Sequence, residues 1–390
     1  MTVSRRPKSP TLAPPRIDPV AACGEHDAMK AAILRQAGQP LSIETLAIDK
    51  PKSREVLIRT AAVGVCHSDL HFIDGTYPYP APFVPGHEAA GIVEAVGPEV
   101  RTVKPGDHVI TCLSIFCGHC EHCLTGHLSR CVSPETKRGK GDAPRLSQNE
   151  LPVQQLVGLG AFAEQMLVHE HGCVAIRRDM PLDRAALIGC AVMTGYGAVT
   201  HTSNVRPGDT VAVIGCGGIG LSVINAALVA GAGRIIAIDR LASKLTLARS
   251  FGATDVVDAS AGDPVAQVLE LTGGGVHHSF EAIGLKVTAE QAWGMLRRGG
   301  TANVIGMIPP GVNIELRGSD FLGEKRIQGS LMGSNRFPVD MPRLVDLYLQ
   351  GRLQLDALIS QRVALAQVNE ALAELKRGEL ARSVIVFDAA

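Results

Sequence analysis

The pattern of apolar and polar positions changes character partway along the chain. Between residues 30 and 130, short β-type runs such as 56–61 and 91–96 are separated by Gly, Pro and Asp turns such as 105–107. Short apolar runs bounded by turn residues are typical of β-strands. We therefore predict a β-rich, barrel-like region in this part of the chain.

From about residue 190, strand-like and helix-like runs alternate. The predicted strands are 210–214, 234–239, 255–257, 277–282 and 301–305, and the predicted helices are 218–230, 242–251, 264–271 and 288–296. Such alternation predicts right-handed βαβ units that build a doubly wound parallel sheet, an α/β fold. From about residue 333 we expect one more helix, near 341–350, and a return of the chain to the first domain.

The first 28 residues differ from the rest. They contain Arg and Pro but no apolar stretch, so they are not a secretory signal. Their acidic residues and prolines also make a poor transit peptide. Because Met29 is followed by the run KAAIL, we expect folded structure to begin there and residues 1–28 to form a disordered arm.

Composition narrows the class of protein. A chain of 390 residues suggests two or three domains, and 46% hydrophobic against 19% charged residues fits a globular enzyme. Lys plus Arg and Asp plus Glu both number 38, so charge gives no reason to expect nucleic-acid or membrane binding. No apolar run reaches the roughly 18–20 residues that a membrane helix needs. The expected location is the cytoplasm.

A glycine-rich motif opens the first helix of the second half. Gly215-Cys-Gly217-Gly218-Ile-Gly220 fits G-x-G-x-x-G, and it lies between a predicted strand and a predicted helix, the context that supports dinucleotide binding. The first glycine permits the turn, the second lets the backbone approach a pyrophosphate, and the last allows close packing of helix on strand. The helix N-terminus supplies free N–H groups for the phosphates.

Asp239 ends the next strand, 19 residues after Gly220. A carboxylate there accepts hydrogen bonds from the adenosine ribose hydroxyls and repels a 2′-phosphate, which predicts NAD in preference to NADP. Arg240 is discordant, because a neighbouring Arg can hold a 2′-phosphate. We assign both residues, and Lys244, to the cofactor site.

Four of the ten cysteines crowd into one short segment: Cys117, Cys120, Cys123 and Cys131. Four thiolates with no spare position form a closed tetrahedral zinc site, which is structural. An iron–sulfur cluster is the rival, but the ferredoxin spacing has a three-residue last gap followed by Pro. Here the gap is seven residues and Val132 follows, so zinc is favoured. A disulfide pairing would need an oxidising compartment that nothing else indicates.

A second set is dispersed along the chain: Cys66, His87 and Cys190. Taken together, one His and two Cys make a zinc site with three protein ligands and an open fourth position, which is the catalytic type. Spacing alone does not show that the three side chains meet.

With these motifs in hand, the chain resembles the zinc-containing alcohol dehydrogenases of the medium-chain dehydrogenase/reductase superfamily. The matching motifs are C-H-S-D-x-x-H from residue 66, G-H-E-x-x-G from residue 86, the four-Cys lobe, G-C at 189–190, the glycine motif and A-R-S at 381–383. The resemblance implies a GroES-like catalytic domain (29–191 and 333–390), a Rossmann NAD-binding domain (192–332) and two zinc ions per chain. It also implies a homodimer or homotetramer.

The resemblance further implies a role for each matching position. Asp69 would orient the zinc-bound imidazole, and Glu88 would lie beside the zinc and help exchange its fourth ligand. Ser68 and His71 would relay the alcohol proton to water. His67 and Arg382 would contact the cofactor phosphates. Thr194 and Ile219 would pack on the nicotinamide ring.

The implied reaction is reversible hydride transfer between a primary or secondary alcohol and NAD. The alternative is glutathione-dependent formaldehyde oxidation. Enzymes of that type carry acidic residues where this chain has Tyr77 and Tyr79, and an Arg where it has Glu135. A non-catalytic zinc protein that binds nucleic acid or a protein partner is disfavoured by the zero net charge and the intact dispersed metal set. The sequence leaves open which alcohol is used and what segment 132–158 does.

Overall fold

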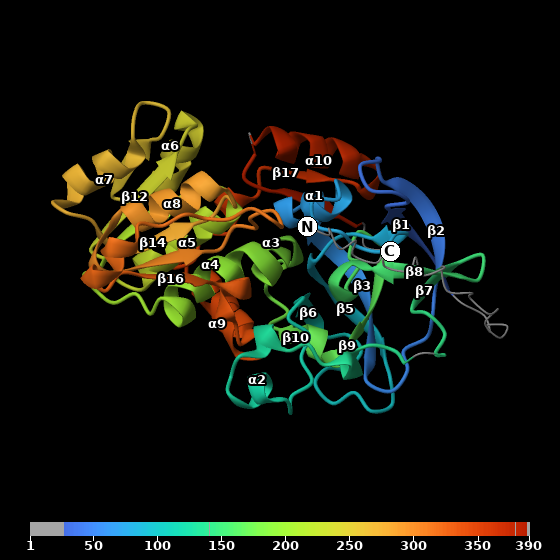
Figure 1. Ribbon diagram of the computed structural model, residues 1–390. Helices are drawn as coiled ribbons and strands as arrows, with labels where there is room; N and C mark the ends of the chain where they lie inside the picture. Colours follow the sequence, from blue (N-terminus) through green and yellow to red (C-terminus); the bar gives the residue numbers. More distant parts are fainter. Residues whose placement is uncertain (1–26, 140, 379, 388–390) are drawn as a thin grey trace, which may run out of the picture.

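The computed structural model describes residues 27–139, 141–378 and 380–387, and these form a β-rich domain beside an α/β domain (Figure 1). The predicted arm, residues 1–28, lies almost wholly outside the described residues. Strand β1 begins at Asp27, two residues before the predicted start of folded structure. No helix in the described ranges is long and apolar enough to cross a membrane.

Two sheets build the β-rich domain. The first has the strand order β1 (Asp27–Ile33), β2 (Ser42–Ile48), β7 (Leu146–Gln148), β8 (Leu151–Gln155), β4 (Phe83–Val84). The second has the order β10 (Cys173–Ile176), β6 (His108–Thr111), β5 (Glu88–Val96), β3 (Glu55–Gly64), β18 (Ser383–Val386), β17 (Gln361–Val363), and β9 (Gln165–His169) also pairs with β3. The predicted runs 56–61 and 91–96 lie at the centre of this second sheet, in β3 and β5.

The α/β domain contains a six-stranded sheet in which every neighbouring pair is parallel. Its order is β13 (Asp255–Asp258), β12 (Arg234–Asp239), β11 (Thr210–Ile214), β14 (Val276–Glu281), β15 (Leu296–Val304), β16 (Arg326–Gly329). The connecting helices are α5 (Gly218–Val229), α6 (Ala242–Ser250), α7 (Pro264–Thr272) and α8 (Lys286–Gly294). This is the Rossmann arrangement that the alternating pattern predicted, with the strand order reversing between β11 and β14.

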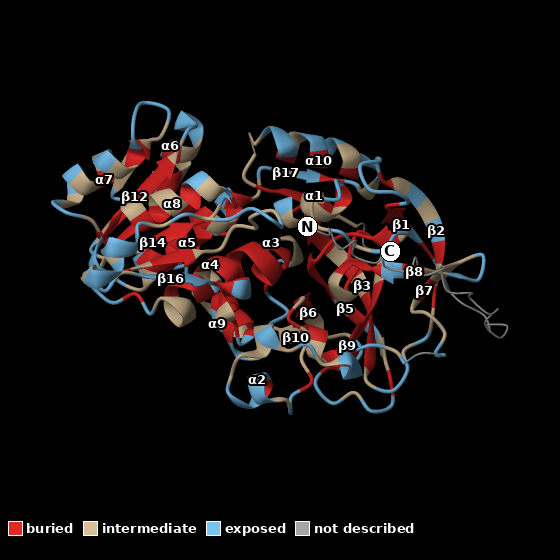
Figure 2. Ribbon diagram, viewed as in Figure 1, coloured by how far each residue is buried: buried red, intermediate tan, exposed pale blue. Residues whose placement is uncertain are grey.

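A continuous helical stretch joins the two domains. It runs through α3 (Leu182–Leu187), the π-helical turn η5 (Ile188–Val192), α4 (Met193–Gly197) and a second π-helical turn, η6 (Ala198–Thr202). Its central residues are buried (Figure 2), and it belongs to one apolar core that extends from the catalytic domain to β11 and α5. The sequence analysis did not anticipate this stretch, since a helix that is apolar all round lacks the amphipathic period.

The C-terminal segment returns to the β-rich domain, as expected. After α9 (Phe337–Leu349), strand β18 pairs antiparallel with β3, with Val384 opposite Gly64. Helix α10 (Val368–Arg377) packs against α1 (His67–Ile73). The return places residues near Arg382 beside the start of α5, where they can face a ligand bound by the α/β domain.

Candidate active site

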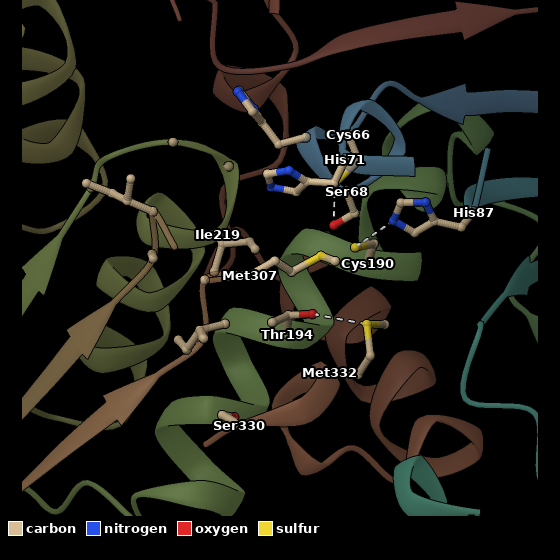
Figure 3. Close-up of a pocket in the computed structure, with 18 of the residues that line it drawn as sticks. Cys66, Ser68, His71, His87, Cys190, Thr194, Ile219, Met307, Ser330 and Met332 are labelled. Atoms are coloured by element: carbon tan, nitrogen blue, oxygen red, sulfur yellow. Dashed lines mark hydrogen bonds between the residues drawn. The ribbon is translucent and has the colours of Figure 1, made fainter. Parts of the chain in front are cut away.

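The three dispersed metal-ligand candidates meet in space. The sulfur atoms of Cys66 and Cys190 and a ring nitrogen of His87 all lie within 4.8 Å of one another, and all three residues are buried. His87 Nε2 lies 3.2 Å from Cys190 Sγ (Figure 3). Cys66 immediately precedes α1, His87 precedes β5, and Cys190 lies in the π-helical turn η5. Three converging ligands of these types fit a tetrahedral zinc with one open position.

Asp69 hydrogen-bonds to two residues of this metal set, Cys66 and His87. Its side chain is fully buried, and its Oδ1 lies 2.9 Å from His87 Nδ1 and accepts the backbone N–H of Gly86 at 3.0 Å. Its Oδ2 accepts the backbone N–H of Cys66 at 3.2 Å. A carboxylate that accepts from Nδ1 leaves Nε2, the nitrogen nearest the sulfurs, free for a metal.

The four clustered cysteines also converge. Cys117, Cys120, Cys123 and Cys131 have all their sulfur atoms within 4.8 Å of one another, in the lobe around α2 (Glu121–Leu124). The backbone N–H groups of Cys117 and Cys120 point at sulfurs within the cluster, at 3.3 and 3.4 Å. Such donors stabilise thiolates, as a closed structural zinc site requires.

The glycine motif has the local geometry that each glycine was expected to provide. Gly215 has a φ of +92°, which favours glycine. A Cβ on Gly220 would lie 1.7 Å from the carbonyl oxygen of Gly215, so helix and strand could not pack as they do. A Cβ on Gly217 would meet nothing within 4 Å, which leaves open space at the start of α5 for a phosphate.

A single cavity of about 620 Å³ connects the metal set with the glycine loop. Its wall includes most of the predicted site: Cys66, His67, Ser68, His71, His87, Cys190, Thr194, Gly215, Gly217, Gly218, Ile219, Asp239, Lys244 and Arg382. Arg240 is exposed and does not contribute to this wall, although it had been grouped with the cofactor residues. Asp239 accepts the backbone N–H groups of Cys216 at 2.8 Å and Arg240 at 2.8 Å, so its carboxylate is fixed beside the glycine loop.

Comparisons with known proteins agree with this arrangement. Residues 52–178 match the alcohol dehydrogenase GroES-like domain, and residues 218–349 match the zinc-binding dehydrogenase domain. The NDMA-dependent alcohol dehydrogenase of Amycolatopsis methanolica is 38% identical over 92% of this chain and 99% of its own length. The S-(hydroxymethyl)glutathione dehydrogenase of Haemophilus influenzae is 38% identical over 92% of this chain and 97% of its own.

Among solved structures, the benzyl alcohol dehydrogenase of Acinetobacter calcoaceticus superposes with a TM-score of 0.88 at 33% identity, covering 93% of this chain and all of that one (100%). The chain belongs to the zinc-binding alcohol dehydrogenase family. The predicted family, fold class and zinc dependence of this dehydrogenase are therefore confirmed.

A buried contact between Glu88 and Arg382 in the dehydrogenase links the metal set to the glycine loop. Glu88 is fully buried, and its Oε2 lies 3.5 Å from Arg382 Nη2. The Arg382 guanidinium also borders Gly218, where a Cβ would lie 2.7 Å from Nη2. Burial raises the pKa of Glu88 to about 8, against the attraction of Arg382. Arg382 thus places a positive charge between Glu88 and the space at the N-terminus of α5.

The hydroxyls of Tyr77 and Tyr79 make contacts within the protein. Tyr77 donates its hydroxyl to the carbonyl oxygen of Ile308, on the loop after β15, and Tyr79 donates to the carbonyl oxygen of Gln155 at 2.8 Å. Glu135, where the resemblance predicts an Arg in glutathione-dependent enzymes, is exposed and lies 3.1 Å from His119.

Ion pairs hold segment 132–158 of the dehydrogenase to the rest of the β-rich domain. Arg138 donates to Glu55 at 2.6 and 2.9 Å and to Asp49 at 2.5 Å, and Arg145 also donates to Glu55 at 2.7 Å. The segment then forms β7 and β8, and among its described residues Leu156 and Val157, near its end, reach the cavity. Val157 has a φ of +48°, which is unusual for a β-branched residue.

The apolar wall of the cavity was not predicted from the sequence. This wall is contributed by separate loops and helices and contains Phe72, Leu113, Leu156, Val157, Met307, Leu331 and Met332. Thr194, from α4, donates its hydroxyl to the Met332 sulfur at 3.5 Å, which connects the wall to the helix that carries Cys190 (Figure 3). Single apolar residues on loops give no recognisable pattern, so no signal could have found them.

Proposed function

We propose that this dehydrogenase interconverts an apolar primary or secondary alcohol and its aldehyde or ketone, with NAD as the hydride carrier. One observation carries the proposal: the same cavity is lined by the Cys66, His87 and Cys190 set and by the glycine loop. When bound there, zinc supplies Lewis-acid polarisation of the alcohol oxygen, and NAD accepts the hydride.

The side chains around the metal set would hold and orient it. Cys66, His87 and Cys190 would bind the catalytic zinc, and Asp69 would keep the His87 ring in the tautomer that presents Nε2. The four-Cys lobe would hold the second, structural zinc. Glu88 would lie close enough to assist exchange of the fourth ligand.

The residues around the glycine loop would bind the cofactor. Lys244 and Arg382 line the cavity together with His67 and the N-terminus of α5, so two positively charged side chains and free N–H groups face the place expected for the pyrophosphate. Asp239 would accept the ribose hydroxyls. Thr194 and Ile219 line the cavity from α4 and α5 and would pack on the nicotinamide ring.

The alcohol proton would leave by way of side chains on α1. Ser68 lies in the cavity with its Oγ 3.7 Å from Cys66 Sγ, beside the metal set (Figure 3). His71 is three residues later on the same helix, so the two side chains share one face. We propose that Ser68 accepts the proton and that the imidazole of His71 passes it to water, because imidazoles exchange protons near neutral pH.

The wall that faces the metal set favours a neutral, apolar substrate. Phe72, Leu156, Val157 and Met307 present hydrocarbon, and burying a methylene of the substrate there gains about 0.8 kcal/mol. The similarity to a benzyl alcohol dehydrogenase supports this class. Glutathione-adduct oxidation is the second candidate, because the S-(hydroxymethyl)glutathione dehydrogenase is 38% identical to this chain, as is the NDMA-dependent alcohol dehydrogenase, but Tyr77 and Tyr79 provide no charge for glutathione.

The test is a panel of straight-chain, branched and aromatic alcohols with NAD, followed by the nicotinamide absorbance. Formaldehyde is assayed with and without glutathione in parallel. We expect kcat/KM to rise with hydrocarbon size and no dependence on glutathione. Activity confined to formaldehyde plus glutathione would establish the second candidate, and no turnover of any alcohol would refute the proposal.

We also propose a homodimer or homotetramer in the cytoplasm. The cysteines in the described part of the chain are free thiols, which fits a reducing compartment. Light scattering coupled to size-exclusion chromatography measures the oligomeric state, and a monomer at working concentration would contradict the assembly.

A further inference from the structure

A buried carboxylate outside the roles proposed above stands at the carboxyl end of β14. Glu281 is the last residue of that strand and is fully buried. Strand β14 lies between β11, which leads into the glycine loop, and β15, whose end continues to Met307. Polar groups at this edge of an open parallel sheet border the crevice in which ligands bind.

One oxygen of this carboxylate holds the loop after β14. Glu281 Oε1 accepts the backbone N–H groups of Ile283 at 2.9 Å and Gly284 at 2.7 Å, and the hydroxyl of Thr288 at 2.8 Å. Thr288 lies in the first turns of α8, and the N-cap residue of that helix, Leu285, provides no side-chain cap. The carboxylate therefore ties both the loop and the start of α8 to the end of the strand.

The loop after β15 packs on the Glu281 side chain and backbone. A Cβ on Gly306 would lie 2.6 Å from Glu281 Oε2 and 2.1 Å from the backbone nitrogen of Gly284. The backbone N–H groups of Ile305 and Gly306 donate to the carbonyl oxygen of Glu281 at 2.9 and 3.1 Å. Neither glycine could carry a side chain without separating the two loops.

The loop held by Oε1 also contacts the glycine motif. A Cβ on Gly215 would lie 2.5 Å from Ile283 Cγ1. Gly215, Ile283 and Gly306 all line the cavity. Glu281 thus lies where three cavity-lining loops meet.

We propose that Glu281 is a positioning residue for the cofactor. By fixing loops 282–284 and 305–307 against the glycine loop, its carboxylate sets the width of the crevice that receives NAD, without touching NAD itself. A buried carboxylate is a poor packing group, and Oε2 has no hydrogen-bond partner among the described residues. The three bonds to Oε1 are therefore what this side chain contributes. The inference rests on the proposed function, because it takes NAD as the ligand.

The test measures NADH binding by fluorescence, in the absence of alcohol, for wild type, Glu281→Leu and Glu281→Gln. The leucine variant loses all three bonds, and its Kd should rise at least about tenfold. The amide oxygen of the glutamine variant can still accept them, so its Kd should stay within about threefold of wild type. The KM for alcohol at saturating NAD should change little in either variant.

Asp263→Ala is the matched control. Asp263 is a carboxylate that accepts the backbone N–H of Val265 at 2.9 Å at the start of α7, and it is not part of the cavity wall. Its loss should lower the melting temperature without changing the Kd for NADH. Glu281→Asp, shorter by one methylene, provides a second variant if the leucine protein does not fold, and it should show the same rise in Kd.

The outcomes separate the two proposals. Wild-type protein that binds no NADH contradicts the proposed function itself. Wild-type protein that binds NADH, with folded Glu281→Leu or Glu281→Asp binding it equally well, overturns the role of Glu281. A Kd that follows the melting temperature across all variants, Asp263→Ala included, overturns it as well, since general stability would then explain the effect.

Discussion

Replacing Asp69 by Asn exchanges one carboxylate oxygen beside the metal set for an NH₂ group. The carboxylate of Asp69 accepts three hydrogen bonds, two at Oδ1 from Gly86 and His87 and one at Oδ2 from Cys66. An amide offers one acceptor oxygen, while its nitrogen can only donate. The side chain of the Asp69→Asn variant would keep the two bonds at the oxygen and turn its NH₂ group toward the N–H of Cys66.

The expected magnitude follows from that count. One buried donor loses its partner, which costs about 1–3 kcal/mol, and the imidazole loses the negative charge that strengthens it as a ligand. Changes of this kind behind a zinc ligand typically cost about 10–100-fold in metal affinity. We expect the lower end of that range for Asp69→Asn and the upper end for Asp69→Ala, which removes all three bonds.

The assay is competition for zinc between the apo-protein and a chelator, combined with kcat at measured zinc occupancy. Added zinc should restore much of the kcat of the Asp69→Asn variant. Asp74→Asn is the matched control, because Asp74 is the C-cap of the same helix and its carboxylate accepts, among the described residues, from Thr76 alone, at 3.0 and 2.7 Å. The reasoning is wrong if Asp69→Asn holds zinc as tightly as wild type, or if Asp74→Asn weakens zinc equally.

Four further predictions concern other parts of the molecule. Metal analysis of fully loaded protein should give two zinc ions per chain, and one zinc or none would contradict this prediction. Cys123→Ser should lower the melting temperature, whereas Cys190→Ser should chiefly abolish turnover. The kcat/KM ratio should favour NAD over NADP, and Asp239→Gly should reduce that preference by about tenfold or more, since a charged hydrogen-bond acceptor is lost; an NADP preference in wild type refutes the assignment. Ser68→Ala should lower kcat for oxidation by about 10²–10⁴-fold, and His71→Gln should cost less, with the greatest loss at low pH; near-normal kcat in Ser68→Ala at every pH would exclude the relay. Burial raises the pKa of Glu170, but the backbone N–H of Arg101 and the Arg54 and Thr102 side chains outweigh burial and hold it at about 2, below its usual 4.5. The stabilisation by Glu170 is therefore complete above pH 4.5 and lost as the pH falls toward 2, so Glu170→Gln should lower the melting temperature at pH 7 and flatten its decline in acid; parallel melting curves would contradict this.

Much of the α/β domain could be predicted because its signals are local. Strands β11 and β12 match the predicted runs 210–214 and 234–239 at both ends, since each is a buried apolar run closed by a glycine or an aspartate. Helix α8 was predicted at 288–296 but begins at Lys286 and ends at Gly294, and Leu296 already belongs to β15. Its N-cap, Leu285, is not a capping residue type, so the sequence carried no start signal.

The residues of the active site also divide into those with a local sequence signal and those without one. Cys, His and Asp at family spacings identified the metal ligands, but only the fold brings Cys190 to Cys66. The apolar wall around Val157 depends on loop conformations that no periodicity encodes. Glu281 is an exception, because a carboxylate within the last two residues of a predicted strand of the parallel sheet is a readable signal. Applied to the run 277–282, that rule would have selected it from sequence.

The helical stretch that joins the domains makes the chain sensitive to changes in length at one place. Cys190 lies in the π-helical turn Ile188–Val192, and Thr194 follows four residues later in α4. A π-helical turn holds one residue more than an α-helical turn, so deleting a residue there restores the ordinary winding, leaves the helix beyond it in its former orientation and redirects the side chains inside the turn. Point substitutions in 188–192 alter packing, whereas a one-residue deletion beside Cys190 would turn the Cys190 side chain away from Cys66 and His87 while Thr194 in α4 stayed in place. Variation in this segment should therefore be confined to residue type and leave residue number unchanged.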